Sequence, residues 1–335
     1  MKRVTGLYDM ISTRENLREA FCKARKGARQ SKAALAFESR LEENLCHLVE
    51  ELLTQTVQPQ PATQFVIHDP KERTITAPSF RDRVLHHAIM NVCEPHLDRW
   101  LIAHSFACRK GKGRLAALER ATKYAQSHGW FLKLDIRGYF ESIPHDRLLE
   151  ELRRKFKDAR LLVLLERLIR AHTGRAAAGC GLPIGSLLSQ HLANFFLNPV
   201  DRLCREQLRT PGYVRYMDDF VLWEDDPARL NSHWRAVAAL VQDRLGLVLK
   251  STAHLNRTAH GMNFCGFRIF PGWRVLNRRS RRRFESRLRA LDDGLAAGEM
   301  PEAAAQTRAQ SLIAFAREGS SWQFRRRVLV RASTA

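Results

Sequence analysis

Residues 213–222 read YVRYMDDFVL, so that two adjacent acids, Asp218 and Asp219, separate two short runs rich in apolar and aromatic residues. Runs of this kind favour strands, and Asp is common in the turns between strands, so the stretch predicts a β-hairpin with both acids at its tip. Two carboxylates beside apolar strands are costly unless positive charge lies close to them. An isolated Asp-Asp pair is also compatible with a plain polar turn. Motifs elsewhere in the chain are needed to distinguish such a turn from a functional acidic site.

A third acid ends another predicted strand. Residues 130–135 read WFLKLD and finish at Asp135. Phosphoryl transfer to a growing nucleic-acid strand depends on metal ions held by carboxylates, and Mg²⁺ prefers oxygen ligands. We therefore expect Asp135, Asp218 and Asp219 to converge and to carry the catalysis.

The overall charge narrows the class of partner. Lys and Arg number 56 against 35 Asp and Glu, a formal net charge of +21, which favours a polyanion such as nucleic acid. No uncharged apolar run approaches the ~20 residues that a spanning helix needs, and the N-terminus has no apolar signal core. Seven scattered cysteines without a C-x-x-C pair disfavour zinc sites and disulfides. These features predict a cytoplasmic protein without a membrane partner.

The pattern along the chain predicts mixed helices and strands. Apolar spacing indicates helix over 8–56, a Pro-containing loop at 55–61 and short strands within 63–80. Helix is expected again over 81–127, interrupted by the basic loop RKGKGR at 109–114.

The second half continues in the same mixed pattern. A helix is expected from about 145, with a buried apolar segment at 161–169, followed by a loop at 181–185 and a helix over 186–208. Residues 263–270, NFCGFRIF, predict one strand with a glycine inside it. From residue 278 the chain is expected to be helical, with seven arginines and one glutamate over 278–289.

The motifs around the acids resemble those of reverse transcriptases. Residues 216–219, YMDD, resemble the YxDD box, and residues 135–140, DIRGYF, resemble the first catalytic motif. The resemblance implies an α+β right-hand fold with fingers, an antiparallel-sheet palm and an α-helical thumb. It also implies two Mg²⁺ ions, with Mn²⁺ as a possible substitute, at Asp135, Ile136, Asp218 and Asp219. By the same correspondence Phe140 is the steric gate that rejects a ribose 2′-OH and so favours dNTPs.

Flanking motifs extend this resemblance. Residues 70–73 and 81–88 look like the fingers motifs of bacterial members, which implies that Lys71 and Arg73 hold the incoming triphosphate. Residues 247–250 lie where the family has a Lys-containing motif, and residues 321–322 with the following arginines resemble the end of a short thumb. The implied primer grip consists of Phe264, Cys265, Gly266 and Phe267. The implied organisation is an N-terminal helical extension (1–62), fingers and palm (63–275) and a basic thumb (276–335).

One box points to a subtype. Residues 184–190 read IGSLLSQ where most reverse transcriptases carry Q-G-x-x-x-S-P, and this form resembles the enzymes of diversity-generating retroelements. The resemblance implies a bacterial or phage-encoded enzyme that copies a structured template-repeat RNA from a DNA primer into cDNA with errors at template adenines. It also implies a small accessory variability protein as partner. Ile184, Gly185 and Gln190 then shape the nucleotide pocket, and we expect Ile184 to lower fidelity because isoleucine cannot hydrogen-bond the nascent pair. The alternative is that Ile184 only packs.

Several alternatives stay open at this stage. The basic residues can contact nucleic-acid phosphates or can simply be solvated; they are Arg109, Lys110 and Lys112 in the loop, and Arg278, Arg279, Arg281, Arg282 and Arg283 in the thumb. Trp322 is expected in the thumb core, and His86, His87 and His145 are expected to be structural. The rival functions are another bacterial reverse transcriptase (retron, group II intron, CRISPR-associated or antiphage) and a non-catalytic RNA-binding protein.

Overall fold

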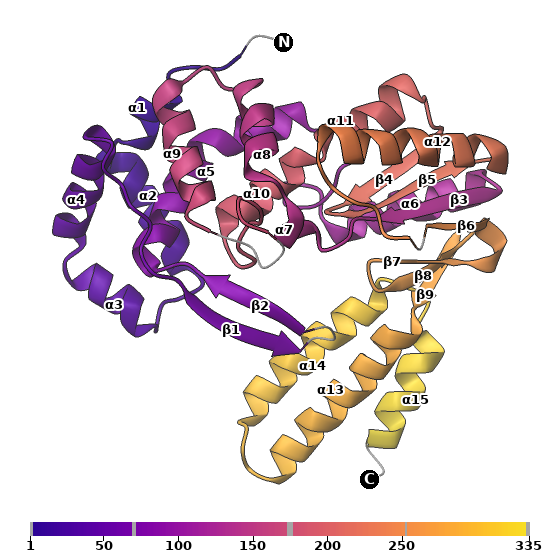
Figure 1. Ribbon diagram of the computed structural model, residues 1–335. Helices are drawn as coiled ribbons and strands as arrows, with labels where there is room; N and C mark the ends of the chain where they lie inside the picture. The colour runs from indigo at the N-terminus through magenta and orange to yellow at the C-terminus, as the bar shows by residue number, and fades with distance from the viewer. Residues whose placement is uncertain (1–2, 69–71, 173–176, 252, 333–335) are drawn as a thin grey trace.

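The computed structural model describes residues 3–68, 72–172, 177–251 and 253–332. It combines helices with antiparallel sheets, so the expected α+β class is confirmed (Figure 1). Lys71 lies outside the described residues. Within the described ranges no helix has the length and apolar character needed to cross a membrane.

The N-terminal region is helical, as expected, and consists of four helices: α1 (Leu7–Ile11), α2 (Arg14–Arg25), α3 (Lys32–Ser39) and α4 (Leu41–Leu53). The hydroxyl of Thr13 accepts from the Asn16 amide, and that of Ser31 accepts from the Ala34 amide. Each of these side chains therefore caps a new helix. α1, α2 and α3 pack against α5 (Phe80–Trp100), and α4 packs against α2 and α3. Most side chains of α5 are buried.

A two-stranded hairpin extends from this helical region towards the C-terminal helices (Figure 1). It pairs β1 (Thr63–His68) with β2 (Glu72–Ala77) in antiparallel register. We call it the fingers hairpin.

The central sheet, here called the palm sheet, has the order β4-β5-β3-β6 and is antiparallel throughout. Its strands are β3 (Trp130–Asp135), β4 (Gly212–Tyr216), β5 (Asp219–Glu224) and β6 (His254–Arg257). Alternate side chains serve two cores, because successive residues of a strand point to opposite faces. Leu132 and Leu222 join the core on the side of α12 (Pro227–Ala239), whereas Phe131 and Trp223 join that of α6 (Arg114–Ser127).

The remaining helices of this region cover the palm sheet and α5: α7 (Tyr139–Ser142), α8 (His145–Arg153), α9 (Ala159–Arg170), α10 (Leu187–Phe196) and α11 (Asn198–Arg202). The helix expected over 186–208 ends in a π-helical turn, η1 (Leu203–Gln207), and a similar turn, η2 (Leu240–Arg244), follows α12. A 3₁₀ turn, η3 (Thr258–His260), follows β6. The apolar segment at 161–169 is buried on one side only, since Val163 is 47% exposed.

The prediction of one strand over 263–270 was wrong. Residues in this stretch form β7 (Met262–Phe264) and β8 (Phe267–Phe270), joined by a turn at Cys265 and Gly266. Both turn residues have positive φ, 46° and 89°, which reverses the chain. This turn and its two strands are called the grip hairpin, and β9 (Trp273–Leu276) completes a three-stranded sheet.

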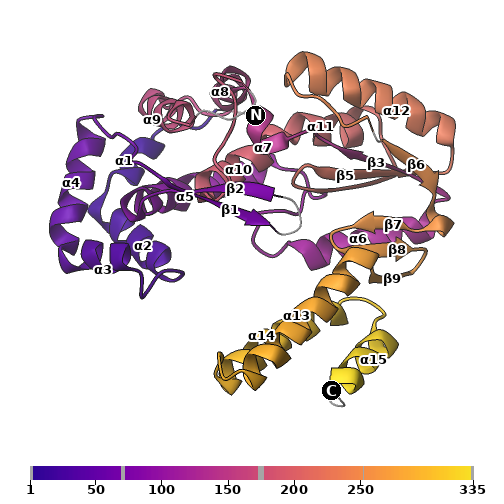
Figure 2. The ribbon, with the colours of Figure 1, turned by 60° about the horizontal axis from the view of Figure 1, so that its bottom comes forward.

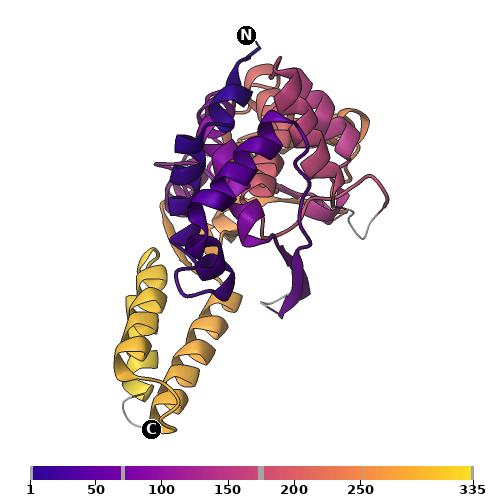
Figure 3. The same ribbon diagram turned by 90° about the vertical axis from the view of Figure 1, so that its left-hand side faces the viewer.

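The C-terminal part forms three helices that project away from the palm sheet (Figures 1 and 3). They are α13 (Arg278–Ala296), α14 (Glu302–Arg317) and α15 (Trp322–Ala332), and we call them the thumb helices. Phe284, Leu288 and Leu291 of α13 are buried at helical spacing and hold the helices together. The expectation that Trp322 lies in this core was wrong, because its side chain is 66% exposed.

Candidate active site

The three acids meet at one end of the palm sheet. Asp135 is the last residue of β3 and lies directly opposite Asp219, the first residue of β5. Asp218 precedes Asp219 in the turn from β4, which ends at Tyr216. The structure therefore brings together the three carboxylates that the sequence singled out. The grip hairpin lies against one face of the palm sheet (Figure 2).

Burial and mutual repulsion change the acidity of this cluster. Burial raises the pKa of Asp218, and the nearby Asp135 carboxylate raises it further. Burial also raises the pKa of Asp219, to about 6, against the opposing effect of the Lys133 ammonium. A raised pKa marks carboxylates that would gain from additional positive charge.

Two lysines already supply part of that charge. Lys133 donates to Asp219 Oδ2 at 2.8 Å and to the carbonyl of Asn263 at 2.7 Å, while the Lys250 ammonium donates to Asp135 Oδ2. The Lys250 amide also donates to the Asp135 carbonyl at 2.9 Å, which fixes the end of β3. Lys133 could be recognised beforehand only as a polar residue inside an apolar predicted strand.

The other carboxylate oxygens lack partners. Oδ1 of Asp135 and Oδ1 of Asp219 are buried without a hydrogen bond. Buried oxygens without a partner are costly, and hard oxygen donors are the ligands that Mg²⁺ prefers. These two atoms therefore fit a divalent cation, although among the described residues no three His, Cys, Asp or Glu side chains are already gathered around one point as metal ligands.

A buried arginine supports the hairpin tip. Arg215 is fully buried and bonds Asp201 through two contacts of 2.7 and 2.6 Å. It also donates to Asn194 Oδ1 at 2.7 Å and to the Met217 carbonyl at 3.0 Å. Met217 has a φ of 55°, which is uncommon for a residue with a side chain. Arg215 thus holds the backbone of the turn that carries Asp218.

The predicted nucleotide-pocket loop is pressed against the fingers hairpin. The Thr76 amide donates to the Ile184 carbonyl at 2.8 Å. Gly185 has a φ of +117°, and a Cβ there would lie 2.9 Å from Cγ2 of Ile75 and 3.0 Å from the Thr76 carbonyl oxygen. Only glycine fits this approach without a shift. Gln190 is exposed on α10, with its Oε1 4.0 Å from the sulfur of Cys108.

Phe140 lies on α7, just after the strand that ends at Asp135. Its side chain is half-buried, and its carbonyl accepts from the Leu182 amide at 2.7 Å. The neighbouring Tyr139 is buried, and its ring lies edge-on to that of Phe140 with the centroids 5.7 Å apart. Phe140 is therefore held on a short, well-anchored turn.

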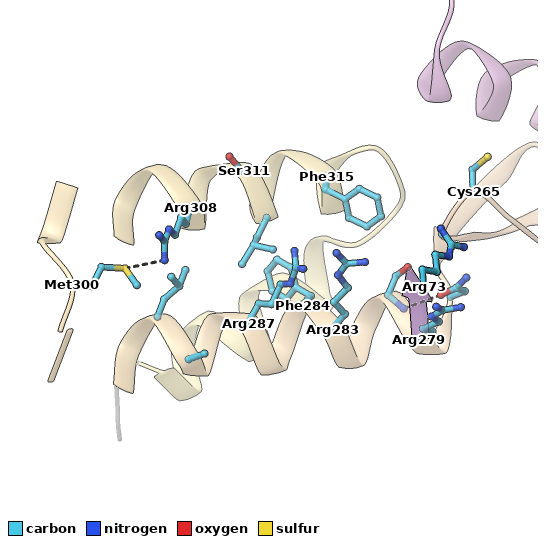
Figure 4. A pocket seen from close by; sticks show the side chains of 16 residues that line it. Arg73, Cys265, Arg279, Arg283, Phe284, Arg287, Met300, Arg308, Ser311 and Phe315 are labelled. Carbon is cyan, nitrogen blue, oxygen red and sulfur yellow. Dashed lines mark hydrogen bonds between the residues drawn. The ribbon is translucent and has the colours of Figure 1, made fainter. Parts of the chain in front are cut away.

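A basic groove begins beside this site and follows the thumb helices. A cavity of about 860 Å³ is lined by α13, α14, the turn of the grip hairpin and Arg73 of the fingers hairpin. No acidic residue is among the described side chains that line it, whereas five arginines are: Arg73, Arg279, Arg283, Arg287 and Arg308. Figure 4 shows Arg279, Arg283 and Arg287 along α13. Arg73 also lowers the pKa of Asp218 electrostatically, which connects the groove to the acids.

The other predicted cations lie elsewhere. The Arg281 guanidinium lies 5.6 Å from the Phe324 ring centroid, and Arg278 and Arg282 face shallower surface hollows. In the loop at 109–114, the Lys110 side chain is 86% exposed. Arg109 turns inward instead, to Asp98 and to the carbonyls of Ile102 and Ser105, in keeping with a structural role. The Lys112 ammonium lies 5.1 Å from the Phe106 ring centroid and donates to the Ala103 carbonyl.

Known proteins share sequence similarity with this chain. Residues 67–269 match the family model described as reverse transcriptase (RNA-dependent DNA polymerase). Protein YkfC of Escherichia coli is 27% identical over 73% of this chain and 74% of its own length. The group II intron-encoded protein LtrA of Lactococcus lactis is 26% identical over 48% of this chain, which matches 28% of LtrA.

A comparison with solved structures finds two telomerases at low similarity. The telomerase of Candida albicans in complex with the TWJ fragment of telomeric RNA has a TM-score of 0.49 and 12% identity, over 70% of this chain and 51% of that one. The apo telomerase of Candida tropicalis has a TM-score of 0.49 and 10% identity, over 66% of this chain and 49% of that one.

Proposed function

The chain belongs to the reverse transcriptase family, and on that premise we propose that it adds deoxynucleotides to the 3′-OH of a DNA primer on an RNA template, with release of pyrophosphate. The observation that carries the proposal is the pairing of Asp135 with Asp219 across β3 and β5, beside Asp218 at the hairpin tip. Three acidic residues at one end of the palm sheet, next to a groove lined by arginines, suit a reaction between phosphates.

The carboxylates of Asp135, Asp218 and Asp219 would hold two Mg²⁺ ions, with Mn²⁺ as a possible substitute. The buried side chain of Ile136 leaves only its main-chain carbonyl to join them. Bound metal would stabilise the charge on the attacking and leaving oxygens. The Oδ1 atoms of Asp135 and Asp219, which lack hydrogen bonds, support this assignment.

Other side chains would position the nucleotide. Arg73 neutralises the triphosphate together with Lys71, which lies outside the described residues. Phe140 occupies the volume that a ribose 2′-OH would need, so dNTPs are preferred. Ile184, Gly185 and Gln190 border the base pair being formed.

The duplex would bind along the basic groove. Its phosphates would meet the arginines of α13 and α14, and the primer end would rest on the turn of the grip hairpin. Cys265 and Gly266 line the groove there, and the buried side chains of Phe264 and Phe267 hold the turn in place. Lys110 and Lys112 of the loop at 109–114 would also contact the nucleic acid. The corresponding subdomains are a helical extension (1–62), fingers and palm (63–275) and a basic thumb (276–335).

We further propose that the enzyme serves a diversity-generating retroelement of a bacterium or phage. The support is the sequence IGSLLSQ at 184–190, in which Ile184 and Gln190 replace the usual Gln and Pro. Its template would be a structured template-repeat RNA, its cDNA would carry errors at template adenines, and its partner would be an accessory variability protein. The second candidate is a reverse transcriptase related to group II intron enzymes, which the similarity to LtrA favours. Near-identical DNA repeats beside the gene, differing at adenines, would distinguish the two.

Primer extension tests the central claim. Wild type is compared with Asp218→Ala and with Asp243→Ala, which removes an exposed acid from η2. We expect metal-dependent dNTP incorporation by wild type and Asp243→Ala, and its loss in Asp218→Ala with binding of the primer–template retained. Equal incorporation by all three proteins would refute the proposal and leave a non-catalytic RNA-binding role.

A further inference from the structure

Two exposed tryptophans lie at the junction of the palm and the thumb helices. Trp273, the first residue of β9, is 48% exposed, and Trp322, the first residue of α15, is 66% exposed. The Ser320 amide donates to the Arg274 carbonyl at 2.8 Å, so the segments that carry the two tryptophans run side by side. In Figure 1, α15 lies next to the three-stranded sheet that contains β9.

An arginine lies beside Trp322, and another lies beside the stacked pair of Trp273 and Phe270. The Arg325 guanidinium lies 5.6 Å from the Trp322 ring centroid. The Trp273 ring stacks on Phe270, with the centroids 4.3 Å apart and the planes 9° apart, and the Arg268 guanidinium lies 5.4 Å from the Phe270 centroid. The junction therefore presents two aromatic surfaces, each with a cation beside it.

Hydrogen bonds hold both guanidinium groups in place. Arg268 donates to the His260 carbonyl at 2.6 Å, and Arg325 donates to the Ser321 hydroxyl at 3.2 Å. Both acceptors are neutral oxygens, so these bonds orient the cations and leave their positive charge intact. A preorganised cation loses little freedom when it meets a phosphate.

Trp273, Phe270 and Trp322 with the neighbouring Arg268 and Arg325, here called the tryptophan surface, are separate from the basic groove. The turn of the grip hairpin, Cys265 and Gly266, lines the groove, whereas Phe270 lies at the opposite end of β8. Trp273 and Trp322 are likewise absent from the groove lining, as are Arg268 and Arg325. A ligand on the tryptophan surface would therefore leave the groove open for the duplex.

We propose that this surface is a second nucleic-acid site that binds unpaired RNA flanking the copied segment of the template. Bases stack on exposed aromatic rings, and arginines beside those rings hold the phosphates. A paired base is already stacked inside its duplex, so only an unpaired stretch can offer its base faces. The formal net charge of +21 suits a polyanion rather than an apolar partner. The choice of RNA rests on the proposed reverse transcriptase function, in which the template is RNA.

Binding measurements with matched templates test this site. One RNA–DNA primer–template has blunt ends, and the other carries an unpaired RNA flank of about ten nucleotides, within the size range of single-stranded sites. Wild type is compared with Trp273→Ala, Trp322→Ala and their combination. Trp234→Ala on α12 is the control, since that tryptophan is 36% exposed and lies on another element.

We expect the flank to strengthen binding by wild type and by Trp234→Ala. The double variant should lose about tenfold or more in affinity for the flanked template and should bind the blunt template as wild type does. Trp322→Phe should keep part of the gain, because phenylalanine still stacks. Wild-type affinity of the double variant for the flanked template would overturn the proposal, as would a clear preference for a DNA flank.

Two further results separate this site from the proposed reaction. Asp218→Ala should retain the gain from the flank, because it changes the acids and leaves the tryptophan surface intact. If wild type fails to extend primers while the flank still binds through Trp273 and Trp322, the proposed function falls and the second site stands. Normal primer extension without any effect of the tryptophans would remove the second site alone.

Discussion

Asp135 and Asp219 face each other on two antiparallel strands. In each carboxylate, Oδ2 accepts a hydrogen bond from a lysine, and Oδ1 is buried without a partner. Like charges directly opposite on neighbouring strands destabilise a sheet. Lys133 and Lys250 offset part of this repulsion. A bound divalent cation would reduce the repulsion that remains between the two carboxylates.

Asp219→Asn should make the protein more stable at neutral pH. The pKa of Asp219 is raised to about 6 in the folded chain, above the value of about 3.9 expected when unfolded. The folded state thus holds this proton more tightly, and the contribution of Asp219 to stability becomes unfavourable as the pH rises through 6. Removing the charge should recover up to about 3 kcal/mol at pH 8 and nothing below about pH 4. Thermal unfolding across this pH range measures the difference.

Asp225→Asn is the control of opposite sign. Asp225 accepts from the Gly129 amide and contacts His128, which lower its pKa. Its carboxylate therefore contributes stability above about pH 4, and that contribution disappears as the pH falls. The variant should melt below wild type at neutral pH. A stabilising effect of both substitutions would mean that general charge reduction, and not the site, explains the result.

Gly185→Ala should separate the loop at 184–190 from the fingers hairpin. The added methyl would meet Ile75 and the Thr76 carbonyl at 3.0 Å or less, on a backbone with a φ of +117°. We expect a loss of about 1–3 kcal/mol in unfolding free energy and a higher KM for dNTP.

Gly111→Ala provides the comparison for that variant. Gly111 has a φ of +70° but no neighbour within 4 Å of a built Cβ, so it carries backbone strain without a clash. The Gly111→Ala variant should therefore have the same KM for dNTP as wild type. Equal effects of both variants on this KM would argue against a specific contact at Gly185.

Arg215→Met should destabilise the protein by about 3–5 kcal/mol, because it leaves the fully buried Asp201 carboxylate without its cation. Changing Asp201 to Asn in the same chain should recover part of the loss. Arg147→Met, which removes an exposed pair with Glu150, should cost less than about 1 kcal/mol. Chemical unfolding measures all three. A small effect of Arg215→Met would show that the hairpin tip does not depend on this arginine.

Arg283→Ala and Arg282→Ala compare adjacent residues on different faces of α13. Arg283 lines the groove, whereas Arg282 faces a surface hollow with Glu285 and Asp293. If Arg283 contacts a phosphate of the duplex, its loss should weaken binding and reduce the slope of log affinity against log salt by roughly 0.7–0.9. Arg282→Ala should change neither quantity as much. Titrations of a blunt RNA–DNA duplex at several salt concentrations decide, and identical slopes for the two variants would contradict the groove as the duplex site.

Ile184→Gln should reduce misincorporation opposite template adenine. Glutamine restores a polar group beside the nascent pair, and such a group can add about 1–3 kcal/mol of discrimination. The main-chain bond from Thr76 does not depend on the side chain and should persist. Ile184→Leu keeps the position apolar and should keep the error rate. An unchanged error rate in Ile184→Gln would remove this residue from the account of fidelity.

The sequence predicted the elements that depend on local pattern. The strand over 130–135 and the paired strands within 213–222 follow from apolar runs with polar ends, and the position of Asp135 beside the tip follows from the family motif. The contact of Lys133 with Asp219 could not be predicted, because it depends on the pairing of β3 with β5. The family motif placed a lysine within 247–250, but its contact with Asp135 depends on a bridge between Ile136 and Leu249, which lie far apart in the sequence.

The failures have physical causes as well. Cys265 adopts a positive φ that cysteine rarely takes, so the turn within 263–270 could not be predicted from composition. Trp322 was expected inside because tryptophan is usually well buried, yet the thumb core is completed by Phe284 and Phe324 instead. The burial of Arg215 could not be predicted, because an arginine inside a strand is buried only when a partner such as Asp201 is available from another element.

The hydrogen bond between Thr76 and Ile184 has a mechanical consequence. It couples the strand that bears Arg73 to the segment that precedes α10. At Gly185 the two segments are so close that no side chain fits between them. If the fingers hairpin tilts towards an incoming triphosphate, as the proposed function implies, the loop at 184–190 should move with it. Binding of the triphosphate and discrimination between bases would then be coupled. A nucleotide whose phosphates bind in the wrong position would also be discriminated less accurately.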